Sequence, residues 1–471
     1  MKSRPRRDQE FREKRVLIVG LGLHGGAASA ARWFARQGAQ VRVTDLKSAQ
    51  DLAPSIRRLQ GWPIDYHLGQ HRPADFRWAE VIYQNQGVLS TMPLLAAARR
   101  RGVEIVNEAS IFFRFCPATI VGVTGTRGKS TTTALLTMML QRQHRRTVVS
   151  GNIRQVPMLD LLDRLSADHW VVLELSSFQL EFLPAVGLNP HVAIMTNLQV
   201  DHLNRYRTLS AYAQAKYQLF RFQRPADVAV LNYNSSWARR VRDITAGQVL
   251  WFSQLHRPPG WSVSLRGLEV IERRGRNEER LLSLNDWSLP GRHQRDNLLA
   301  AVAGARAMAV SAANIRRAVR QFRGLPHRQE LVRRWGGHQF INDTAATTPD
   351  GTLAAIEVFP AGLFIVGGVD KALRFRPLAE ACQRRSLRLV FLPGSATAKL
   401  WRVLLRIGYH GRHAFADSMA EAVQQAVRLA RPGQPIVLSP GAASFGLFQH
   451  EFDRGQQFVR IVNRLPNALR A

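Results

Sequence analysis

A glycine-rich loop that ends in a lysine and a serine is the segment of this sequence with the clearest chemistry. Residues 125–130 read GTRGKS and follow the apolar run TIVGVT. In such a loop, backbone amides cradle phosphate oxygens, Lys129 reaches the β- and γ-phosphates, and the Ser130 hydroxyl can bind Mg²⁺. Val123 stands where the longer Walker A pattern has its first glycine, so the loop is a shortened form. The segment predicts a nucleoside triphosphate site.

A second glycine-rich turn lies near the amino terminus. Gly20, Gly22 and Gly25 match the pattern GxGxxG between the apolar run RVLIV and a helix of small residues. Asp45 follows about twenty residues later, at the end of the expected strand VRVTD. This spacing is typical of a Rossmann-like unit, in which amides at a helix N-terminus face a phosphate. The alternative is that the glycines serve only the packing of a tight turn.

Alternating strands and helices must position both loops. The first domain runs to VEIVNEAS, and the second contains the strands WVVLE and AIMTN, then a polar linker and a helix that carries Asn297. The third contains the strands FIND, LFIVGG, LRLVFLPG and PIVLSP. We therefore expect an α/β protein of three consecutive domains, Rossmann-like, P-loop ATPase-like and Rossmann-like, over residues 1–107, 108–323 and 324–471.

The composition narrows the class of protein. The formal charge is +32, from 66 lysines and arginines against 34 acidic residues, and only seven of the cations are lysines. Such a charge suits nucleic acid or an anionic membrane. The arginines are scattered, however, so we expect a compositional bias and no nucleic-acid partner. Two cysteines cannot build a disulfide framework, and no apolar run approaches the ~20 residues of a membrane span. A cytoplasmic location without a transmembrane segment is expected.

Seven motifs occur in one order: TGTRGKSTT, ELSSFQLE, TNLQVDHLNRY with AQAK, GRHQRDN, GLPHRQE, INDTAAT and SPGAAS. Together they resemble the Mur ligases, ATP-dependent enzymes that add amino acids in peptidoglycan synthesis, and GLGLHG with ELSSFQLE most resembles the MurD type. The resemblance implies a cytoplasmic monomer that joins glutamate, with D-glutamate favoured, to UDP-N-acetylmuramoyl-L-alanine through an acyl phosphate. It also implies that the first domain holds UDP. A nicotinamide oxidoreductase is rejected, because it leaves the phosphate loop and the third domain unexplained.

The resemblance assigns catalytic roles to Lys129, Glu174, His202 and Lys216. Two Mg²⁺ sites are implied, with Ser130, Glu174, His202 and Lys216 as ligands, the last as a carbamate formed with carbon dioxide. Arginine cannot replace a lysine in that reaction, because only a neutral amine reacts. Other interpretations remain: a solvated acid for Glu174, a hydrogen-bonded pair of His202 with its neighbouring aspartate, and a helical lysine extending to solvent for Lys216.

Further site residues are also carried over from the resemblance. The implied ATP-binding residues are Thr126, Arg127, Gly128, Lys129, Ser130, Thr131, Thr132, Asn297, Arg328 and Asp343. The implied substrate-binding residues are Gly22, Leu23, His24, Asn152, Ser176, Thr347, Lys371 and Ser444. Asp45, Leu46 and Lys47 are expected near the UDP, and His327 could be structural.

Two departures alter the expected amino-acid pocket. Where MurD sequences usually read DSKATN, this chain reads DTAATT from Asp343, so that Ala345 replaces the lysine. Seven residues after Ser444, where the family often has an aromatic residue, stands Glu451. The alternatives are therefore an L-glutamate-adding variant, another Mur or folylpolyglutamate-type ligase, or a nucleotide-regulated protein that binds nucleic acid or a membrane surface.

Overall fold

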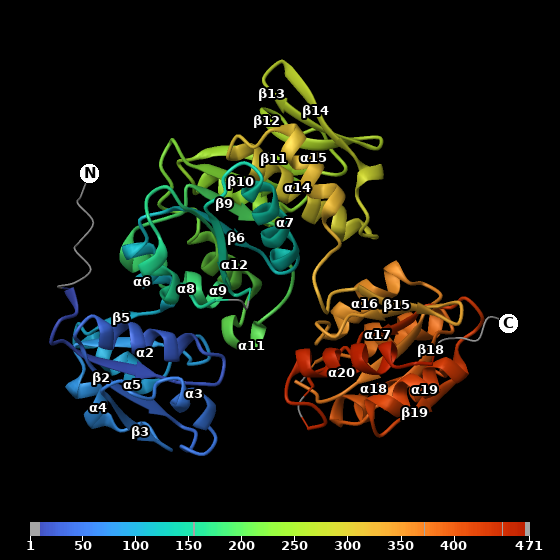
Figure 1. Ribbon diagram of the computed structural model, residues 1–471, viewed down its shortest axis with the longest axis horizontal. Helices are drawn as coiled ribbons and strands as arrows, with labels where there is room; N and C mark the ends of the chain where they lie inside the picture. Colours follow the sequence, from blue (N-terminus) through green and yellow to red (C-terminus); the bar gives the residue numbers. More distant parts are fainter. Residues whose placement is uncertain (1–9, 154–155, 372, 445, 467–471) are drawn as a thin grey trace. The chain divides into compact units, whose positions relative to one another are not determined.

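The computed structural model describes residues 10–153, 156–371, 373–444 and 446–466. They form three sheets of five, nine and six strands, each flanked by helices (Figure 1). By internal contacts the chain divides into two compact units, Met1–Ser288 with Arg292–Phe322, and Leu289–Gly291 with Arg323–Ala471. The first two sheets belong to the first unit and the third sheet to the second. None of the described helices has the length and apolar character needed to cross a membrane.

The first sheet is entirely parallel, in the order β3-β2-β1-β4-β5. Its strands are β1 (Arg15–Val19), β2 (Gln40–Asp45), β3 (Ile64–Leu68), β4 (Val81–Gln84) and β5 (Glu104–Val106). Its helices are α2 (Gly26–Arg36), α3 (Ala53–Arg57), α4 (Pro73–Trp78) and α5 (Pro93–Arg100). The run VLIV of β1 is fully buried, as expected for a central parallel strand that is covered on both faces.

The second sheet has the order β14-β13-β12-β11-β10-β9-β6-β8-β7. Its parallel strands are β6 (Thr119–Thr124), β7 (Thr147–Gly151), β8 (Trp170–Glu174), β9 (Val192–Met195), β10 (Val228–Asn232), β11 (Gln248–Ser253) and β12 (Trp261–Arg266). The strands β13 (Glu269–Arg274) and β14 (Asn277–Ser283) extend it as antiparallel hairpins.

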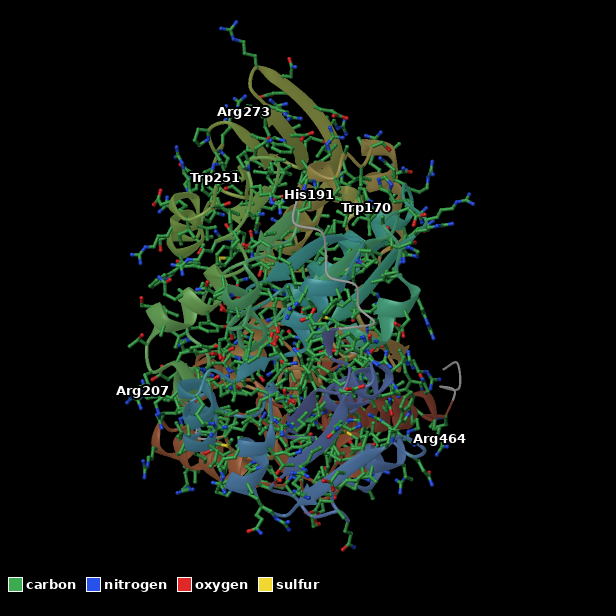
Figure 2. All side chains as sticks on the ribbon, turned by 90° about the vertical axis from the view of Figure 1, so that its left-hand side faces the viewer. Trp170, His191, Arg207, Trp251, Arg273 and Arg464 are labelled. Carbon is green, nitrogen blue, oxygen red and sulfur yellow. The ribbon has the colours of Figure 1, made fainter. Side chains whose placement is uncertain are left out.

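The expectation of a polar linker before Asn297 was wrong. The strands β10 to β14 occupy that part of the chain. The outermost strand, β14, looks polar in sequence because its first four residues, NEER, are exposed to solvent. It pairs with β13, whose Arg273 is labelled in Figure 2. Their buried positions, such as Val270 and Leu282, were too few to reveal a strand by composition.

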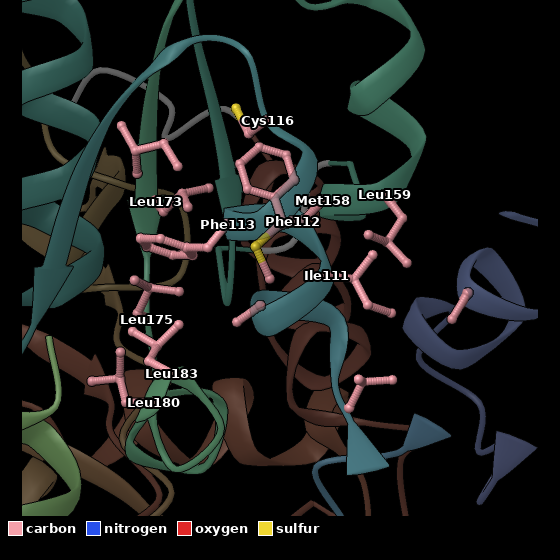
Figure 3. Packing of buried hydrophobic residues seen from close by; sticks show 14 of the residues in the cluster. Ile111, Phe112, Phe113, Cys116, Met158, Leu159, Leu173, Leu175, Leu180 and Leu183 are labelled. Atoms are coloured by element: carbon pink, nitrogen blue, oxygen red, sulfur yellow. The ribbon is translucent and has the colours of Figure 1, made fainter. Parts of the chain in front are cut away.

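Helices cover both faces of the second sheet. The longer ones are α6 (Glu108–Phe115), α7 (Lys129–Gln141), α12 (Leu209–Tyr217), α14 (Arg292–Ala307) and α15 (Ala312–Gln321). The short ones are α8 (Met158–Leu161), α9 (Ser177–Leu180), α10 (Leu183–Val186), α11 (Leu203–Tyr206), α13 (Ser236–Arg239), η1 (Leu162–Arg164), η2 (Arg240–Asp243) and η3 (Leu284–Asp286). Figure 3 shows the core between α6, α8 and β8, where Phe112, Phe113 and Met158 pack near Leu173. This core continues into the first sheet.

The third sheet has the order β15-β16-β20-β17-β18-β19 and is parallel except for β15. Its strands are β15 (Glu330–Trp335), β16 (His338–Asn342), β17 (Leu363–Gly367), β18 (Arg388–Leu392), β19 (His413–Phe415) and β20 (Ile436–Leu438). Its helices are α16 (Pro349–Val358), α17 (Arg376–Arg384), α18 (Ser395–Arg406), α19 (Met419–Leu429) and α20 (Glu451–Asn463). The loops after β16, β17 and β20 meet at one edge of the sheet, where open parallel sheets bind ligands.

Candidate active site

The phosphate loop closes tightly between β6 and α7. Gly128 is left-handed (φ 81°) and precedes the first residue of α7, Lys129. The Lys129 ammonium donates to the carbonyl oxygens of Gly125 and Thr126, both at 3.0 Å. A Cβ on Gly128 would lie 2.0 Å from Oδ1 of Asn297, so only glycine fits between the loop and α14. The loop is therefore positioned by sequence-distant contacts as well as by its glycines.

Residues that directly follow β9 form hydrogen bonds with the phosphate loop. The amide of Arg127 donates to Oδ1 of Asn197 at 3.0 Å, and Thr196 donates its hydroxyl to the Arg127 carbonyl at 2.7 Å. The hydroxyl of Thr126 accepts from the Gln199 amide at 3.0 Å. Asn197 and Gln199 belong to TNLQ, directly after β9. Neither was among the predicted site residues, although polar residues after a parallel strand are the signal that could have found them.

Lys216 is buried beneath this loop. Its side chain donates to the Gly125 carbonyl at 2.9 Å, and the residue is 1% exposed. Burial, and then the positive charge of Lys129, lower the Lys216 pKa well below its ordinary value, while the carboxylates of Asp201 and Glu174 act in the opposite direction. The interpretation of Lys216 as a lysine extending to solvent was wrong. The fold instead favours a neutral amine at this position.

Glu174 ends β8, next to the strand that leads into the phosphate loop. It pairs with Val123 across the sheet and is 2% exposed, so the interpretation as a solvated acid was wrong. Its Oε1 accepts from the Asn152 side chain at 3.2 Å. No donor among the described residues reaches its buried Oε2. A buried carboxylate oxygen without a donor is suited to a cation.

His202 lies at the edge of the same group of residues, just before α11. Burial and the charges of Lys216 and Lys129 lower its pKa, while Asp201 opposes that shift. Its Nε2 lies 3.8 Å from Oδ2 of Asp201, beyond hydrogen-bond distance, so this contact does not tie the ring to its neighbour. The ring packs edge-on against Phe178, with 4.9 Å between centroids. His202 is thus brought within electrostatic reach of both lysines.

The side-chain oxygens near the phosphate loop are of the kind that bind Mg²⁺. Mg²⁺ prefers oxygen ligands from one or two carboxylates together with phosphates. The Glu174 carboxylate and the hydroxyl of the partly exposed Ser130, the second residue of α7, offer oxygens of this kind. Among the described residues, no three histidine, cysteine or acidic side chains form a metal-binding group.

The other predicted ATP residues of the first unit have defined places. Thr131 and Thr132 are buried in the first turn of α7, and the Thr132 hydroxyl lies 3.5 Å from the Asn297 carbonyl. Asn297 donates its side-chain amide to Gln294 at 3.0 Å. Its other side-chain atom, Oδ1, is the one that faces Gly128. Asn297 therefore lies against the phosphate loop itself.

The amino-terminal glycine turn is organised by Asp45. The carboxylate of Asp45 accepts from the amides of Gly22 (3.1 Å) and Lys47 (2.9 Å). Gly20 (φ 83°) and Gly25 (φ 89°) have left-handed backbones, which favour glycine, and a Cβ on Gly20 would also lie 2.8 Å from Val88. The exposed residues that the turn presents are Leu23, His24 and Leu46.

Asn152 and Ser176 flank Glu174. The Asn152 amide donates to the Glu174 carbonyl at 2.7 Å, besides its side-chain contact with the carboxylate. Ser176 caps α9 through a reciprocal capping box with Gln179, and its hydroxyl donates to Gln86, in the turn that follows β4 of the first sheet, at 3.1 Å. Ser176 therefore joins the second sheet to a turn of the first, whereas Asn152 is held against Glu174.

In the second unit, the loops at one sheet edge carry the remaining predicted residues. Asp343 is buried and accepts from the Ser439 hydroxyl at 2.8 Å and the Gln329 amide at 3.2 Å. Ser444 is buried, Thr347 is half-buried, and Lys371 and Arg328 are exposed. An isolated bridge between Val369 and Ala443 joins the loop of Lys371 to that of Ser444.

His327 makes a structural contact. Its Nδ1 lies 2.9 Å from the side-chain amide of Asn342, which also donates to Glu330 at 3.2 Å. Its backbone has φ 67° and its amide donates to the Glu330 carboxylate at 2.8 Å. Burial lowers the pKa of the ring. These contacts fix the turn that carries Arg328.

Arg454, which was not among the predicted site residues, links two loops of the second unit. Its fully buried guanidinium donates to the hydroxyl (2.9 Å) and carbonyl (3.0 Å) of Thr344 and to the carbonyl of Ala442 (3.2 Å). Burial lowers its pKa to about 10, although Glu451 favours the charged form. The position of an arginine three residues after Glu451 on one helix was the available signal. A buried cation thus holds together two of the three loops that were expected to bind glutamate, those of Thr347 and Ser444.

Three family models match the chain in sequence order. The Mur ligase MurD-like N-terminal domain matches residues 14–107, the Mur ligase middle domain residues 123–305, and the Mur ligase glutamate ligase domain residues 327–442. The first and third matches contain the first and third sheets, and the second match contains the second sheet except for residues 119–122 of β6.

Curated relatives cover nearly the whole chain. A protein of Roseiflexus sp. (strain RS-1), named UDP-N-acetylmuramoylalanine–D-glutamate ligase, is 42% identical over 461 residues, which are 95% of this chain and 98% of the relative. A protein of the same name from Symbiobacterium thermophilum is 34% identical over 96% of this chain and 98% of its own length.

Solved structures share the fold at lower identity. The UDP-N-acetylmuramate–alanine ligase MurC of Thermotoga maritima has a TM-score of 0.59 and 19% identity, covering 96% of this chain and 99% of that chain. The E. coli FolC in complex with ADP has a TM-score of 0.57 and 16% identity, covering 76% and 93%. These structures confirm the expected three-domain α/β fold class. With the family models and the relatives, they show that the chain belongs to the Mur ligase family of ATP-dependent, ADP-forming ligases.

Proposed function

We propose that this chain is a cytoplasmic, monomeric ligase that joins D-glutamate to UDP-N-acetylmuramoyl-L-alanine at the cost of ATP, in the synthesis of peptidoglycan precursors. The names of the curated relatives support the substrates, and the match of residues 14–107 to a MurD-like domain favours this enzyme over other ligases of the fold. The observation that carries the chemistry is the convergence of Lys129, Lys216 and Glu174 at the phosphate loop.

The reaction needs an activated carboxylate. A carboxylate oxygen of the alanyl residue attacks the γ-phosphorus of ATP, the bond to the β-phosphate oxygen breaks, and ADP leaves. The glutamate amine then attacks the acyl carbon, inorganic phosphate leaves, and the amine proton passes to solvent or a nearby base. Both steps bring anions together, so their rate depends on positioning and on fixed positive charge. Lys129 and the loop amides supply that charge beside the phosphates.

Glu174 and Ser130 would hold one Mg²⁺, and His202 with Lys216 the second. When bound, these cations neutralise charge that develops on the transferring phosphoryl group. The unpartnered Oε2 of Glu174 supports this assignment, because a buried carboxylate oxygen without a donor is costly unless it meets a cation.

Lys216 is proposed to act as a carbamate formed with carbon dioxide. Carbamate formation requires the neutral amine, and the burial that lowers the Lys216 pKa favours that form. The amine nitrogen would bond to the carbon of carbon dioxide and lose a proton to solvent. The product carries two oxygens of carboxylate character, which suit Mg²⁺ better than an ammonium group does.

The remaining substrate-binding and ATP-binding roles are proposed for residues on the loops around these groups. The glycine turn with Gly22, Leu23 and His24, and the residues Asn152 and Ser176 beside Glu174, would hold the UDP-muramoyl substrate. The proposed ATP contacts outside the phosphate loop are Asn297, Arg328 and Asp343. Thr347, Lys371 and Ser444 lie at one edge of the third sheet and would hold the glutamate carboxylates. Domains are proposed at residues 1–107, 108–323 and 324–471.

The test is an assay of phosphate release by the purified chain. Release should require ATP, Mg²⁺, UDP-N-acetylmuramoyl-L-alanine and glutamate together, and D-glutamate should be used in preference to L-glutamate. Separate omission of each component separates ligation from simple ATP hydrolysis. Phosphate release that ignores the UDP-muramoyl substrate would contradict the proposal, and a preference for L-glutamate would contradict its stereochemical part.

A further inference from the structure

Arginines cluster at the edge of the third sheet where its parallel strands begin, which we call its amino-terminal edge. Helices that follow parallel strands end at this edge, and the last turns of α17, α18 and α19 each carry an arginine. Further arginines follow α17, begin β18, precede β19 and precede β20. We call these residues the basic rim: Arg384, Arg385, Arg388, Arg406, Arg412, Arg428 and Arg431. All except the half-buried Arg388 are exposed.

The stabilisation of helix ends by a cation explains only some of the arginines in the basic rim. A cation in the last turn of a helix interacts favourably with the helix dipole, which accounts for Arg384, Arg406 and Arg428. The remaining four residues lie outside those turns. Burial lowers the pKa of Arg388, and the charges of Arg431 and Arg412 lower it further. Guanidinium groups from three separate segments therefore lie close enough to repel one another.

Acidic residues do little to balance this charge. From Ala381 to Ala416 the sequence contains seven lysines and arginines and no aspartate or glutamate. The exposed Glu357, near the end of α16, is the acid that the topology brings to the same edge. Uncompensated like charges destabilise an isolated fold, so the rim is better explained by an anionic partner than by stability.

Apolar side chains lie beside the rim. The strand β19 is an edge strand, paired within the sheet only with β18 (Figure 1). Next to it, Leu405 of α18 is 56% exposed and Phe415 of β19 is 50% exposed. The half-buried Trp401 packs against His413 (4.5 Å between centroids) and Phe415 (5.5 Å). We call Trp401, Leu405, His413 and Phe415 the apolar flank, and it adjoins Arg406 and Arg412 in sequence.

We propose that the basic rim and the apolar flank together bind the surface of a lipid bilayer that contains anionic phospholipids. Arginines near such a surface are attracted to the anionic headgroups. Tryptophan, phenylalanine and leucine side chains gain free energy by entering the boundary between headgroups and acyl chains. A polynucleotide would engage the arginines but has no comparable use for the exposed aliphatic Leu405. The loops that carry Thr347, Lys371 and Ser444 lie at the opposite edge of the same sheet and remain accessible.

Vesicle co-sedimentation of the full chain tests the proposal. The protein should sediment with vesicles of phosphatidylcholine and phosphatidylglycerol and not with phosphatidylcholine alone. Binding should fall steeply as salt approaches ~1 M, where charges are screened within ~3 Å. The double variant Arg406→Ser/Arg412→Ser should partition about 30-fold more weakly to the anionic vesicles. The matched control Arg276→Ser/Arg317→Ser, which removes two exposed arginines of the first unit, should bind much like the wild type.

A second pair of variants tests the apolar flank. Leu405→Ser should weaken vesicle binding and leave binding to duplex DNA unchanged, whereas Leu268→Ser, at a 55% exposed leucine of the first unit, should affect neither. Three results would overturn the proposal: equal sedimentation with neutral vesicles, equal losses in the rim and control double variants, or a Leu405→Ser protein that binds vesicles as the wild type does. Phosphate release with soluble substrates should be unchanged in every variant, so the outcome is independent of the proposed ligase function.

Discussion

Lys129 and Lys216 donate to the same acceptor, the carbonyl oxygen of Gly125, at 3.0 and 2.9 Å. Two ammonium groups on one carbonyl repel each other, and Lys216 is the more buried of the two. Burial and this repulsion lower the pKa of Lys216 well below its ordinary value. The contacts that hold the phosphate loop thus also favour the neutral, nucleophilic form of the Lys216 amine.

Substitution of Lys216 should separate a carbamate role from a purely cationic one. Lys216→Ala should lose nearly all phosphate release and recover part of it with added short-chain carboxylates, which replace the missing oxygens. Lys216→Arg should be inactive and resist rescue, because a guanidinium does not lose its proton. Carbon-13 NMR with labelled carbon dioxide should show a carbamate signal in the wild type and none in either variant. An active Lys216→Arg enzyme would contradict the prediction.

Removal of Lys129 or Glu174 should reduce turnover without unfolding the protein. Lys129→Ala and Glu174→Ala each remove charge that stabilises the transition state more than the bound substrates. The kcat should therefore fall by more than 10-fold, which corresponds to a barrier raised by more than about 1.4 kcal/mol. Far-ultraviolet circular dichroism should remain unchanged. Glu357→Gln, at an exposed acid of the second unit, serves as the control. A loss below 10-fold in both alanine variants would refute their assignment.

The pH dependence of stability should reveal Glu108. Its Oε1 accepts from the Met158 amide at 2.7 Å, and burial raises its pKa from 4.5 to about 7. Between these two values the folded protein keeps a proton that the unfolded chain has released. The free energy of unfolding should therefore fall as the pH rises through this range, by up to about 3 kcal/mol.

Glu108→Gln tests this dependence, because glutamine keeps an acceptor for Met158 and does not ionise. Relative to the wild type, the variant should become more stable between pH 5 and pH 8. The midpoint of urea unfolding, followed by tryptophan fluorescence at both pH values, measures the change. The control Glu357→Gln should shift little, since that side chain is exposed. An identical pH dependence in Glu108→Gln and wild type would show that this carboxyl group does not titrate in the range.

Lys371 should carry much of the recognition of glutamate. Ala345 replaces the usual lysine of the pocket, and the guanidinium of Arg454 is already engaged by Thr344 and Ala442. Lys371→Met should therefore raise the glutamate KM by about 10-fold or more, with a smaller effect on the KM for ATP. Arg376→Met, at an exposed cation that pairs with Glu380 on α17, is the control. An unchanged glutamate KM would place the carboxylates elsewhere.

The sequence by itself determined the phosphate loop and the order of the domains. Residues 125–130 form a contiguous strand-to-helix turn whose left-handed Gly128 is required locally, so its structure follows from the pattern. The glycine turn around Gly22 was equally visible. The motifs around Glu174, Lys216 and Asp343 were sufficient for the family resemblance, which the comparisons confirmed.

Only the tertiary structure decided the state of individual side chains. Lys216 lies 91 residues from Gly125 in sequence, and a nine-residue helix does not reveal which of its faces will be buried. The strands β13 and β14 were taken for a linker because charged residues, several of them exposed, fill much of both strands. Arg454 was not predicted in a chain with many arginines, since its burial depends on contact with Thr344, which lies 110 residues earlier in the sequence. Burial sets the pKa and hydrogen-bonding needs of a side chain, and burial is a property of the folded chain.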